Sequence, residues 1–494
     1  MTAVELYGLA PTITLSIVGC LALLLEVAGI PIGAKRIGPR GHIAFVTVVG
    51  IAIAAAFAAG SWEDAKAAGT PLFNGQLRLD RFGLLISMMA CAAALISVCL
   101  SVHYMRARDL ERGEVFALIC FSAAGMCVLA MATDLLSLFV GLEVLSVGVY
   151  SLTGLDRESG RSAEAALKYF INGAFASAVL LFGAAMAYGA TGNTSLQSLG
   201  EAVMRGGNTL ALLGFGLVAA GLAFKVATIP FHVWVPDVYD GAPAPVTAFM
   251  SAGVKAAAFA ALLRQVMTLA PNGGAAPTEW VQIAWIVCVG TMTVGNLAAL
   301  AQKRIKRMLA YSSIAHAGYV LVGVVTVLSG RPQAAAPVAY YLLAYTFMSL
   351  GSFGVVAFLE RKEGRGNTFE EWSGAARRYP AAGVAMCIFM FGLAGIPPTA
   401  GFLGKFVLFQ EAVRAGLVPL AIIGVLNSLI SVYYYLRVLV FMYMKEPDRD
   451  LAGAGGPWLT VGLATSAALV IILGVTPARY LDYAQSAVGI SAKK

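Results

Sequence analysis

Long apolar runs, separated by short polar loops, recur along nearly the whole chain. A helix needs roughly 20 apolar residues to cross a bilayer, and about fourteen runs approach that length. Membrane-spanning strands would instead appear as short segments in which apolar and polar residues alternate. The pattern therefore predicts an all-α polytopic membrane protein with about fourteen transmembrane helices.

Prolines interrupt two of these predicted spans, and a lysine lies beside each interruption. In the seventh span Pro230 follows Lys225, and in the twelfth span Pro397 and Pro398 precede Lys405. Proline breaks a helix, and irregular backbone at membrane depth is tolerated only beside protein or a water-filled cavity. Broken helices at corresponding places in two halves are typical of transporter repeats. We therefore predict two inverted five-helix repeats, formed by spans four to eight and nine to thirteen.

These repeats divide the chain into four predicted parts. They are an N-terminal three-helix segment (1–112), a first five-helix repeat of transporter type (113–270), a second inverted five-helix repeat (280–445) and a C-terminal helix (446–494).

The composition excludes a soluble globular protein, because 59% of the residues are hydrophobic, 12% are charged and the mean hydropathy is +0.80. The net charge of +8 could indicate an anionic partner such as a nucleic acid. Most of the 34 basic residues, however, fall in loops on one side of the predicted spans. The positive-inside rule then places both termini on the periplasmic side, and we predict the lipid bilayer, not nucleic acid, as the surrounding partner.

No cofactor or metal site is indicated in the chain. Its seven cysteines all fall within predicted spans, without a CxxC pair. The glycines are scattered at helix-packing positions and form no phosphate-binding loop. We therefore predict that any redox chemistry takes place in other subunits.

Four ionisable residues lie deep within predicted spans: Glu143, Lys225, Lys255 and Lys405. A charged side chain at the membrane centre costs about 2.5–3.5 kcal/mol on insertion scales, so such residues usually serve ion or proton paths. Burial disfavours a charged lysine, whereas a nearby carboxylate favours it. We predict a proton relay in which Glu143 and Lys225 form a pair, and separation of the pair moves the proton to Lys255 and then Lys405.

Three further residues are candidates for accessory roles: Lys168, His232 and His316. Lys168 lies close to a span end, where its side chain could instead reach the membrane surface. Either histidine could equally be a hydrogen-bonded part of the scaffold, although histidine suits a proton relay because it titrates near neutrality. The aromatic residues of the eleventh span are interpreted as packing, and those of the thirteenth as interfacial anchors.

Three stretches resemble one known family: FKVATIPFHVWVPDVYDGAPAPV, KRIKRMLAYSSIAHAGY and GLAGIPPTAGFLGKF. They are similar to the antiporter-like membrane subunits of bacterial respiratory complex I, NADH:quinone oxidoreductase. Within that family the chain resembles the N-type subunits, because PDVYDGAPAPVTAF precedes Lys255 and because the twelfth span carries Lys405, where M-type subunits have a glutamate.

The resemblance implies a subunit that pumps protons when quinone reduction elsewhere in the complex drives it. It implies that Glu143 and Lys225 form the coupled pair, that Lys255 is the central relay and that Lys405 is the outer station. NADH, FMN, iron–sulfur clusters and quinone are then expected in other subunits. The expected neighbours are antiporter-like subunit M and small subunit K, in the inner membrane of a bacterial cell.

Two other functions compete with this interpretation. The chain could be a component of a multisubunit Na⁺/H⁺ antiporter of the same superfamily, or a purely structural membrane anchor. Buried charges count against the anchor, because apolar residues of similar size would serve a scaffold at least as well.

Overall fold

The computed structural model describes residues 2–29, 41–65, 69–361, 366–446 and 453–489. Its α-helices are α1 (Ala3–Gly8), α2 (Ala10–Ala28), α3 (Gly41–Gly60), α4 (Arg81–Ala107), α5 (Glu114–Met131), α6 (Leu135–Thr153), α7 (Gly160–Thr191), α8 (Leu196–Arg205), α9 (Thr209–Val226), α10 (Val235–Gly241), α11 (Ala244–Phe249), α12 (Lys255–Met267), α13 (Thr278–Leu300), α14 (Ile305–Leu328), α15 (Ala335–Leu359), α16 (Ala375–Arg378), α17 (Pro380–Ala394), α18 (Ala400–Arg414), α19 (Val418–Met444), α20 (Pro457–Val475) and α21 (Pro477–Ala487). A short hairpin of β1 (Thr70–Leu72) and β2 (Leu77–Leu79) precedes α4.

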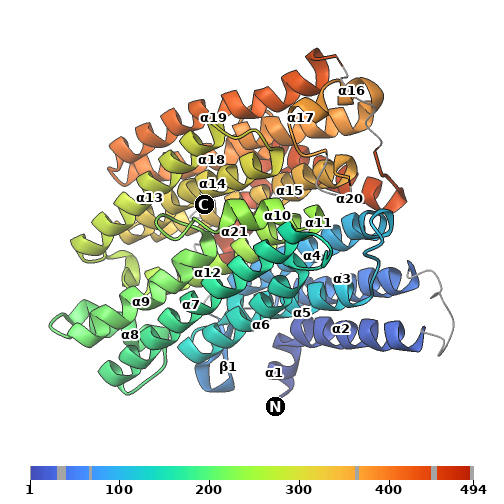
Figure 1. Ribbon diagram of the computed structural model, residues 1–494. Coiled ribbons are helices and arrows are strands. Elements are labelled where there is room, and N and C mark those ends of the chain that lie inside the picture. Colours follow the sequence, from blue (N-terminus) through green and yellow to red (C-terminus); the bar gives the residue numbers. More distant parts are fainter. Residues whose placement is uncertain (1, 30–40, 66–68, 362–365, 447–452, 490–494) are drawn as a thin grey trace.

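The long helices form one bundle, with α2 and α3 on one side and α19 on the opposite side (Figure 1). Among the described residues, 13 helices are long and apolar enough to cross a membrane. The helical form follows from the environment, because a helix satisfies its own backbone hydrogen bonds where lipid offers no partners. The prediction of an all-α polytopic membrane protein is confirmed.

The difference from the predicted fourteen spans lies in the twelfth. The chain there forms two shorter helices, α17 and α18, and Pro397 and Pro398 lie between them. The predicted seventh span ends at Val226, and the chain resumes as the short helix α10 before α11 begins. Proline explains these interruptions locally, since it removes a backbone donor and crowds the preceding turn. The inverted-repeat relationship between the two halves stays a prediction, and so does the four-part division of the chain.

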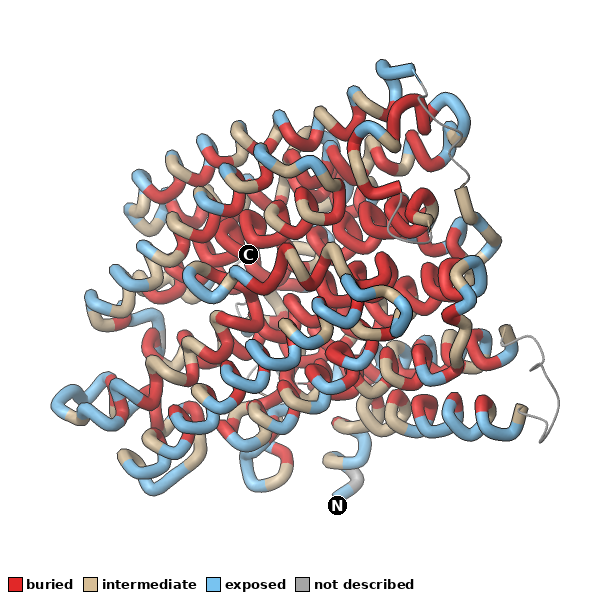
Figure 2. The backbone as a smooth tube through the Cα atoms, viewed as in Figure 1, coloured by how far each residue is buried: buried red, intermediate tan, exposed pale blue. Residues whose placement is uncertain are grey.

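The interior of the bundle is made by three spans. The continuous span Ala244–Met267 is 100% buried, α14 is 94% buried and the span containing α15 is 89% buried, compared with 33% for α2, α13 and α20. Figure 2 shows the same division, with exposed residues gathered on the outer helices. Charged groups on the central spans are therefore surrounded by protein and not by lipid.

Two features of the chain were not anticipated from its sequence. The backbone makes a π-helical turn at Met250–Val254, between α11 and α12. Such turns are rare and occur frequently at functional sites. After α20 the chain also continues into α21, which packs against α15 and α4.

Candidate functional site

Lys225 lies in the last turn of α9, where the helix ends before the proline-containing loop. Its side chain is buried, at 3% exposure. The ammonium donates a hydrogen bond to the Ser146 hydroxyl on α6, at 2.8 Å. The rings of Tyr150 and Tyr169 each lie 5.0 Å from it. Ring faces attract a cation, so aromatic faces and one hydroxyl replace the water that burial removes.

Glu143 lies one helical turn before Ser146 on α6 and is only partly buried. Its carboxylate accepts a hydrogen bond from the Ser177 hydroxyl of α7. The carboxylate attracts the Lys225 ammonium electrostatically. No ion pair within 4 Å joins these two residues in the described structure, and each group instead bonds a serine. The predicted pair is thus a charge interaction and not a direct contact.

Lys255 is the first residue of α12, directly after the π-helical turn. Its ammonium donates to the backbone carbonyl of Ser313 on α14, at 2.7 Å, and to the Ser313 hydroxyl. The ring of Tyr345 lies 5.9 Å away. A buried cation is tolerated when its donors are satisfied. Lys255 therefore lies at the contact between α12 and α14, which belong to two of the three central spans.

Lys405 lies on α18, just beyond the break that separates it from α17. Its ammonium donates to the carbonyl oxygens of Leu393 and Ala394, each at 3.0 Å, and to the Ser428 hydroxyl at 2.9 Å. Those carbonyls are the last of α17, and a helix C-terminus carries partial negative charge that favours a cation. The proline break therefore creates the site that holds this lysine.

His316 on α14 lies near both Lys255 and Lys405. Its ring centroid is 4.9 Å from that of Tyr345, beside Lys255, and 5.6 Å from that of Tyr319, beside Lys405. The Tyr341 hydroxyl lies 2.7 Å from its Nδ1, and the Tyr435 hydroxyl lies 2.9 Å from its Nε2. Each ring nitrogen thus has a hydroxyl partner, which is the arrangement that a proton relay through imidazole requires.

The tyrosines around His316 correct two expectations from the sequence. Tyr341 belongs to the eleventh span and hydrogen-bonds the histidine, so its ring is more than packing. Tyr434 and Tyr435 of the thirteenth span are buried and are not interfacial anchors. The expectation was wrong for these two residues, whereas Tyr433 and Tyr443 of the same stretch are exposed. An aromatic cluster near the end of a span looks the same in sequence whether it faces lipid or the interior.

A polar cluster next to Lys405 was missed entirely. The Asn296 side chain on α13 donates to the Tyr319 hydroxyl at 3.1 Å and to the Asn427 carbonyl oxygen at 3.2 Å. It also accepts from the Tyr434 hydroxyl at 2.8 Å. The Lys405 ammonium lies 4.8 Å from the ring of Tyr319. Two asparagines inside apolar spans were the available sequence signal, because polar residues there seldom lack partners.

Lys168 and His232 lie apart from this central arrangement. The Lys168 side chain is 40% exposed, and its ammonium bonds Glu164 and Asp237, each at 2.7 Å. Burial would raise the pKa of Asp237, but hydrogen bonds and charge from Lys168 and Arg307 lower it below its usual value. His232 is half-buried between α9 and α10, and no hydrogen bond of the described structure joins it to Lys225, Lys255 or Lys405.

Comparisons with known proteins identify the family of this chain. A family model described as "NADH:quinone oxidoreductase/Mrp antiporter, TM" matches residues 132–431. The NADH-quinone oxidoreductase subunit N of Trichlorobacter lovleyi is 43% identical over 98% of this chain and 97% of its own length. The chain belongs to this antiporter-like family. Another relative in the family, subunit N 1 of Sorangium cellulosum, is 42% identical over 97% of this chain and 98% of its own.

Solved structures of the family have the same fold. A chain of respiratory complex I from Thermus thermophilus with bound aureothin matches with a TM-score of 0.79 and 34% identity, covering 95% of this chain and 98% of that one. A chain of the Mrp complex from Dietzia sp. matches with a TM-score of 0.86 and 21% identity, covering 99% and 97%. The predicted resemblance to the N-type members of the family is confirmed.

Proposed function

We propose that this chain moves protons across the membrane as the N-type antiporter-like subunit of an NADH-quinone oxidoreductase. The observation that carries the proposal is the set of three buried ammonium groups on α9, α12 and α18, together with Glu143 on α6. Each ammonium donates to at least one serine hydroxyl, so none is held only by a fixed countercharge. Buried ionisable groups of this kind mark ion or proton paths.

Glu143 and Lys225 are the switching pair of the proposed relay. Their charges attract one another while Ser146 and Ser177 take up the direct hydrogen bonds. A small movement of α6 against α9 changes that attraction, and with it the tendency of Lys225 to keep its proton. The serines allow this movement because a hydroxyl can rotate to follow its partner.

Aromatic residues link the switching pair to the central lysine. The ring of Tyr169, beside Lys225, stacks on Trp234 at 4.5 Å. Trp234 in turn contacts Tyr239, at 6.4 Å between ring centroids. Tyr239 lies on α10, which packs against α14, and α14 carries the Ser313 that bonds Lys255. In this row of aromatic residues the Trp234 ring offers no hydroxyl to carry a proton. The row therefore suits electrostatic coupling of Lys225 and Lys255 better than direct proton transfer.

Between Lys255 and Lys405 the proposed route uses polar side chains. It runs through Ser313, His316 and the hydroxyls of Tyr341 and Tyr435, which bond the histidine on both sides. We assign His316 an accessory role as carrier between the two lysines. Lys168 and His232 are left with peripheral accessory roles, Lys168 by anchoring α10 through Asp237.

Membership of the family supports a proposal for the surroundings of the subunit. We propose that quinone reduction in other subunits drives the relay, and that NADH, FMN and iron–sulfur clusters are bound there. The proposed neighbours are antiporter-like subunit M and small subunit K. The chain would span a bacterial inner membrane with both termini on the periplasmic side, and its two five-helix repeats would be inverted with respect to each other.

The test is Glu143→Gln in the assembled complex, measured as NADH-driven proton uptake and quinone reduction in inside-out membrane vesicles. The amide keeps the shape of the side chain but removes its charge, so Lys225 loses the attraction that controls its proton. We expect the coupled rate to fall about tenfold, equal to about 1.4 kcal/mol of barrier.

Glu201→Gln is the matched control, because Glu201 is an exposed carboxylate paired with Arg205 on α8. Its coupled rate should equal that of the wild type. Normal pumping by an assembled Glu143→Gln complex would rule Glu143 out of the relay. Sodium-dependent exchange without NADH would instead favour a cation antiporter.

A further inference from the structure

A buried turn of three residues, Ala242, Pro243 and Ala244, joins α10 to the span that carries Lys255. Ala242 is the C-cap residue of α10, and Ala244 is the first residue of α11. Backbone groups at the ends of two helices lack partners within those helices, and a proline has no amide hydrogen to donate. All three residues of the turn are buried. Side chains from other elements must therefore hold the turn in place.

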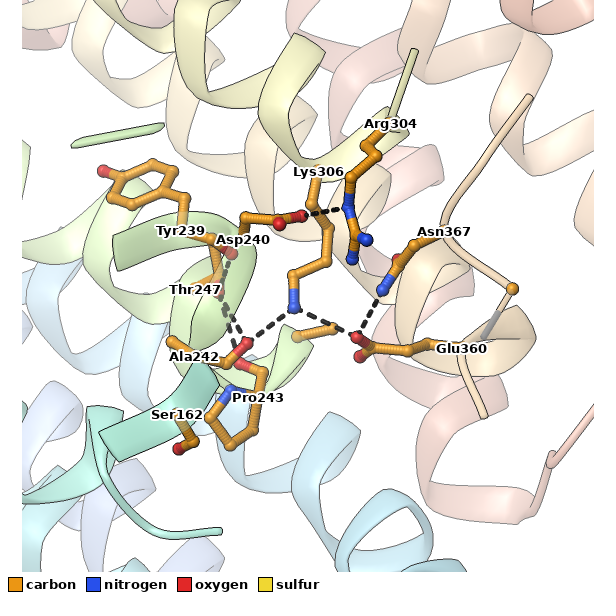
Figure 3. Close-up of polar contacts among 12 residues, drawn as sticks. Ser162, Tyr239, Asp240, Ala242, Pro243, Thr247, Arg304, Lys306, Glu360 and Asn367 are labelled. Atoms are coloured by element: carbon orange, nitrogen blue, oxygen red, sulfur yellow. Dashed lines mark hydrogen bonds and ion pairs between the residues drawn. The ribbon is translucent and has the colours of Figure 1, made fainter. Parts of the chain in front are cut away.

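Glu360, the residue directly after α15, reaches both sides of this turn through two other side chains. One of its carboxylate oxygens accepts a hydrogen bond from the Lys306 ammonium at 3.0 Å, and the same ammonium donates to the Ala242 carbonyl at 2.6 Å (Figure 3). The other oxygen accepts from the Tyr104 hydroxyl at 2.7 Å. That hydroxyl in turn accepts a hydrogen bond from the Ala244 amide at 3.3 Å. One carboxylate thus holds the carbonyl on one side of Pro243 and the amide on the other.

Further contacts fix the carboxylate itself. Asn367 donates to it at 2.8 Å, and the Arg108 guanidinium lies 3.6 Å from it. Glu360 is 6% exposed and Lys306 is 1% exposed, so neither can turn towards water without leaving the other unpaired. We call these residues the Glu360 cluster; its members are Tyr104, Arg108, Lys306, Glu360 and Asn367.

The beginning of α14 holds α10 at two more points. Arg304 bonds Asp240 at 2.9 Å, and Arg307 bonds Asp237 at 2.6 Å. Figure 3 shows the first of these contacts beside the one that Lys306 makes with the turn. Three basic side chains within residues 304–307 therefore fix the end of α10 and the following turn against α14.

The span that carries Lys255 is attached to α14 at two levels. Lys306 and Ser313 are seven residues apart on α14, close to two helical turns, so they face the same side of it. Lys306 holds the turn where the span begins, and Ser313 bonds Lys255 farther along. The π-helical turn at Met250–Val254, a rare form of helix, lies between these two points. A shift of the span at its first attachment would therefore change the position of Lys255 at its second.

We propose that the Glu360 cluster positions Lys255 for proton exchange by holding the turn at the start of its span. This inference rests on the proposed function and adds positioning residues to it. Tyr104, Lys306 and Glu360 act on Lys255 through the backbone of the turn and do not carry the transferred proton. Alignment matters because a small misplacement of reacting groups slows their reaction markedly.

The test is Tyr104→Phe in the complete complex, because it removes one oxygen, keeps the ring and releases the Ala244 amide. Two quantities are measured on verified, assembled complex. Amide hydrogen exchange in peptides that cover residues 238–249 should become about threefold faster, because the turn opens more readily. The coupled rate of NADH-driven proton uptake per assembled complex should fall about threefold, because Lys255 is aligned with Ser313 for less of the time.

Glu360→Met/Lys306→Met is the second variant and serves if Tyr104→Phe fails to assemble. It removes the carboxylate together with the ammonium that holds Ala242, so that neither is left buried without the other. We expect the same faster exchange and the same loss of coupled rate in assembled complex. A merely structural role would instead restore the rate together with the stability.

Tyr340→Phe is the matched control. Tyr340 is as deeply buried on α15, and its hydroxyl donates to the Leu473 carbonyl of α20 at 2.7 Å and not to the turn. Its exchange and its coupled rate should match those of the wild type.

Unchanged exchange in the assembled variants would overturn the holding of the turn, whatever the coupled rate. Faster exchange with a wild-type coupled rate would overturn the positioning of Lys255. Either result would leave the proposed function intact if Lys255→Met loses pumping, whereas normal pumping in Lys255→Met would overturn the proposed function itself.

Discussion

Replacing Lys255 by Met is expected to abolish the proton pumping contributed by this subunit and to slow coupled NADH oxidation at least about tenfold. Lys255 is buried on α12 where this helix meets α14, and its ammonium bonds Ser313. Met keeps most of the volume of the side chain but offers no titratable group. The measurement is the number of protons taken up per NADH oxidised by vesicles that contain the assembled complex.

The Lys255→Arg variant distinguishes a role of Lys255 in proton exchange from a role that needs only its positive charge. A guanidinium retains its proton at any accessible pH, so the variant keeps the charge but cannot relay. We expect it to fail as fully as Lys255→Met. Lys303→Met, which removes an exposed lysine at the start of the loop before α14, is the control and should pump normally. Wild-type pumping by Lys255→Arg would make the role of Lys255 electrostatic and would contradict the relay.

Replacing Glu360 by Ala is expected to destabilise the subunit by about 3–5 kcal/mol, because it leaves buried cations without their countercharge. Lys306 is 1% exposed and bonds this carboxylate at 3.0 Å, while Arg108 lies 3.6 Å from it. The measurement is the amount of subunit in the purified complex and the temperature at which the solubilised complex dissociates. Glu370→Ala, at an exposed carboxylate in the following turn, should leave both unchanged.

A double substitution shows whether the instability of Glu360→Ala comes from an unpaired charge or from lost packing. In Glu360→Met/Lys306→Met the unpaired ammonium is removed together with the carboxylate, and apolar replacement of a buried ion pair is often nearly neutral. We expect the double variant to recover most of the lost thermal stability. Equal instability of the single and double variants would show that the cluster acts through packing and not through its charges.

The pKa of Glu360 determines how the stabilisation by this cluster depends on pH. Burial would raise the pKa of Glu360, but Lys306 and Arg108, with hydrogen bonds from Tyr104 and Asn367, lower it to about 2. Because the folded pKa is below the ordinary value of 4.5, the stabilisation is complete above that value and is lost as pH falls towards 2. The Glu360 carboxylate thus stays ionised near neutral pH.

The hydropathy pattern was sufficient to predict the fold class, because apolar length and proline position are properties of short stretches of chain. It also identified Glu143, Lys225, Lys255 and Lys405, since a charge within an apolar run is costly wherever that run packs. The same local signals located the interruptions near Pro230 and Pro397.

What the sequence could not determine is which side chains meet. Tyr341 and Tyr435 bond His316 from positions 25 and 119 residues away along the chain. Ser146 takes the direct hydrogen bond of Lys225 that was expected of Glu143. Such contacts depend on how each helix is rotated about its axis and on which neighbours it packs against. A nearly uniformly apolar span carries little information about that rotation, so only the tertiary structure decided how the buried charges that the sequence revealed are connected.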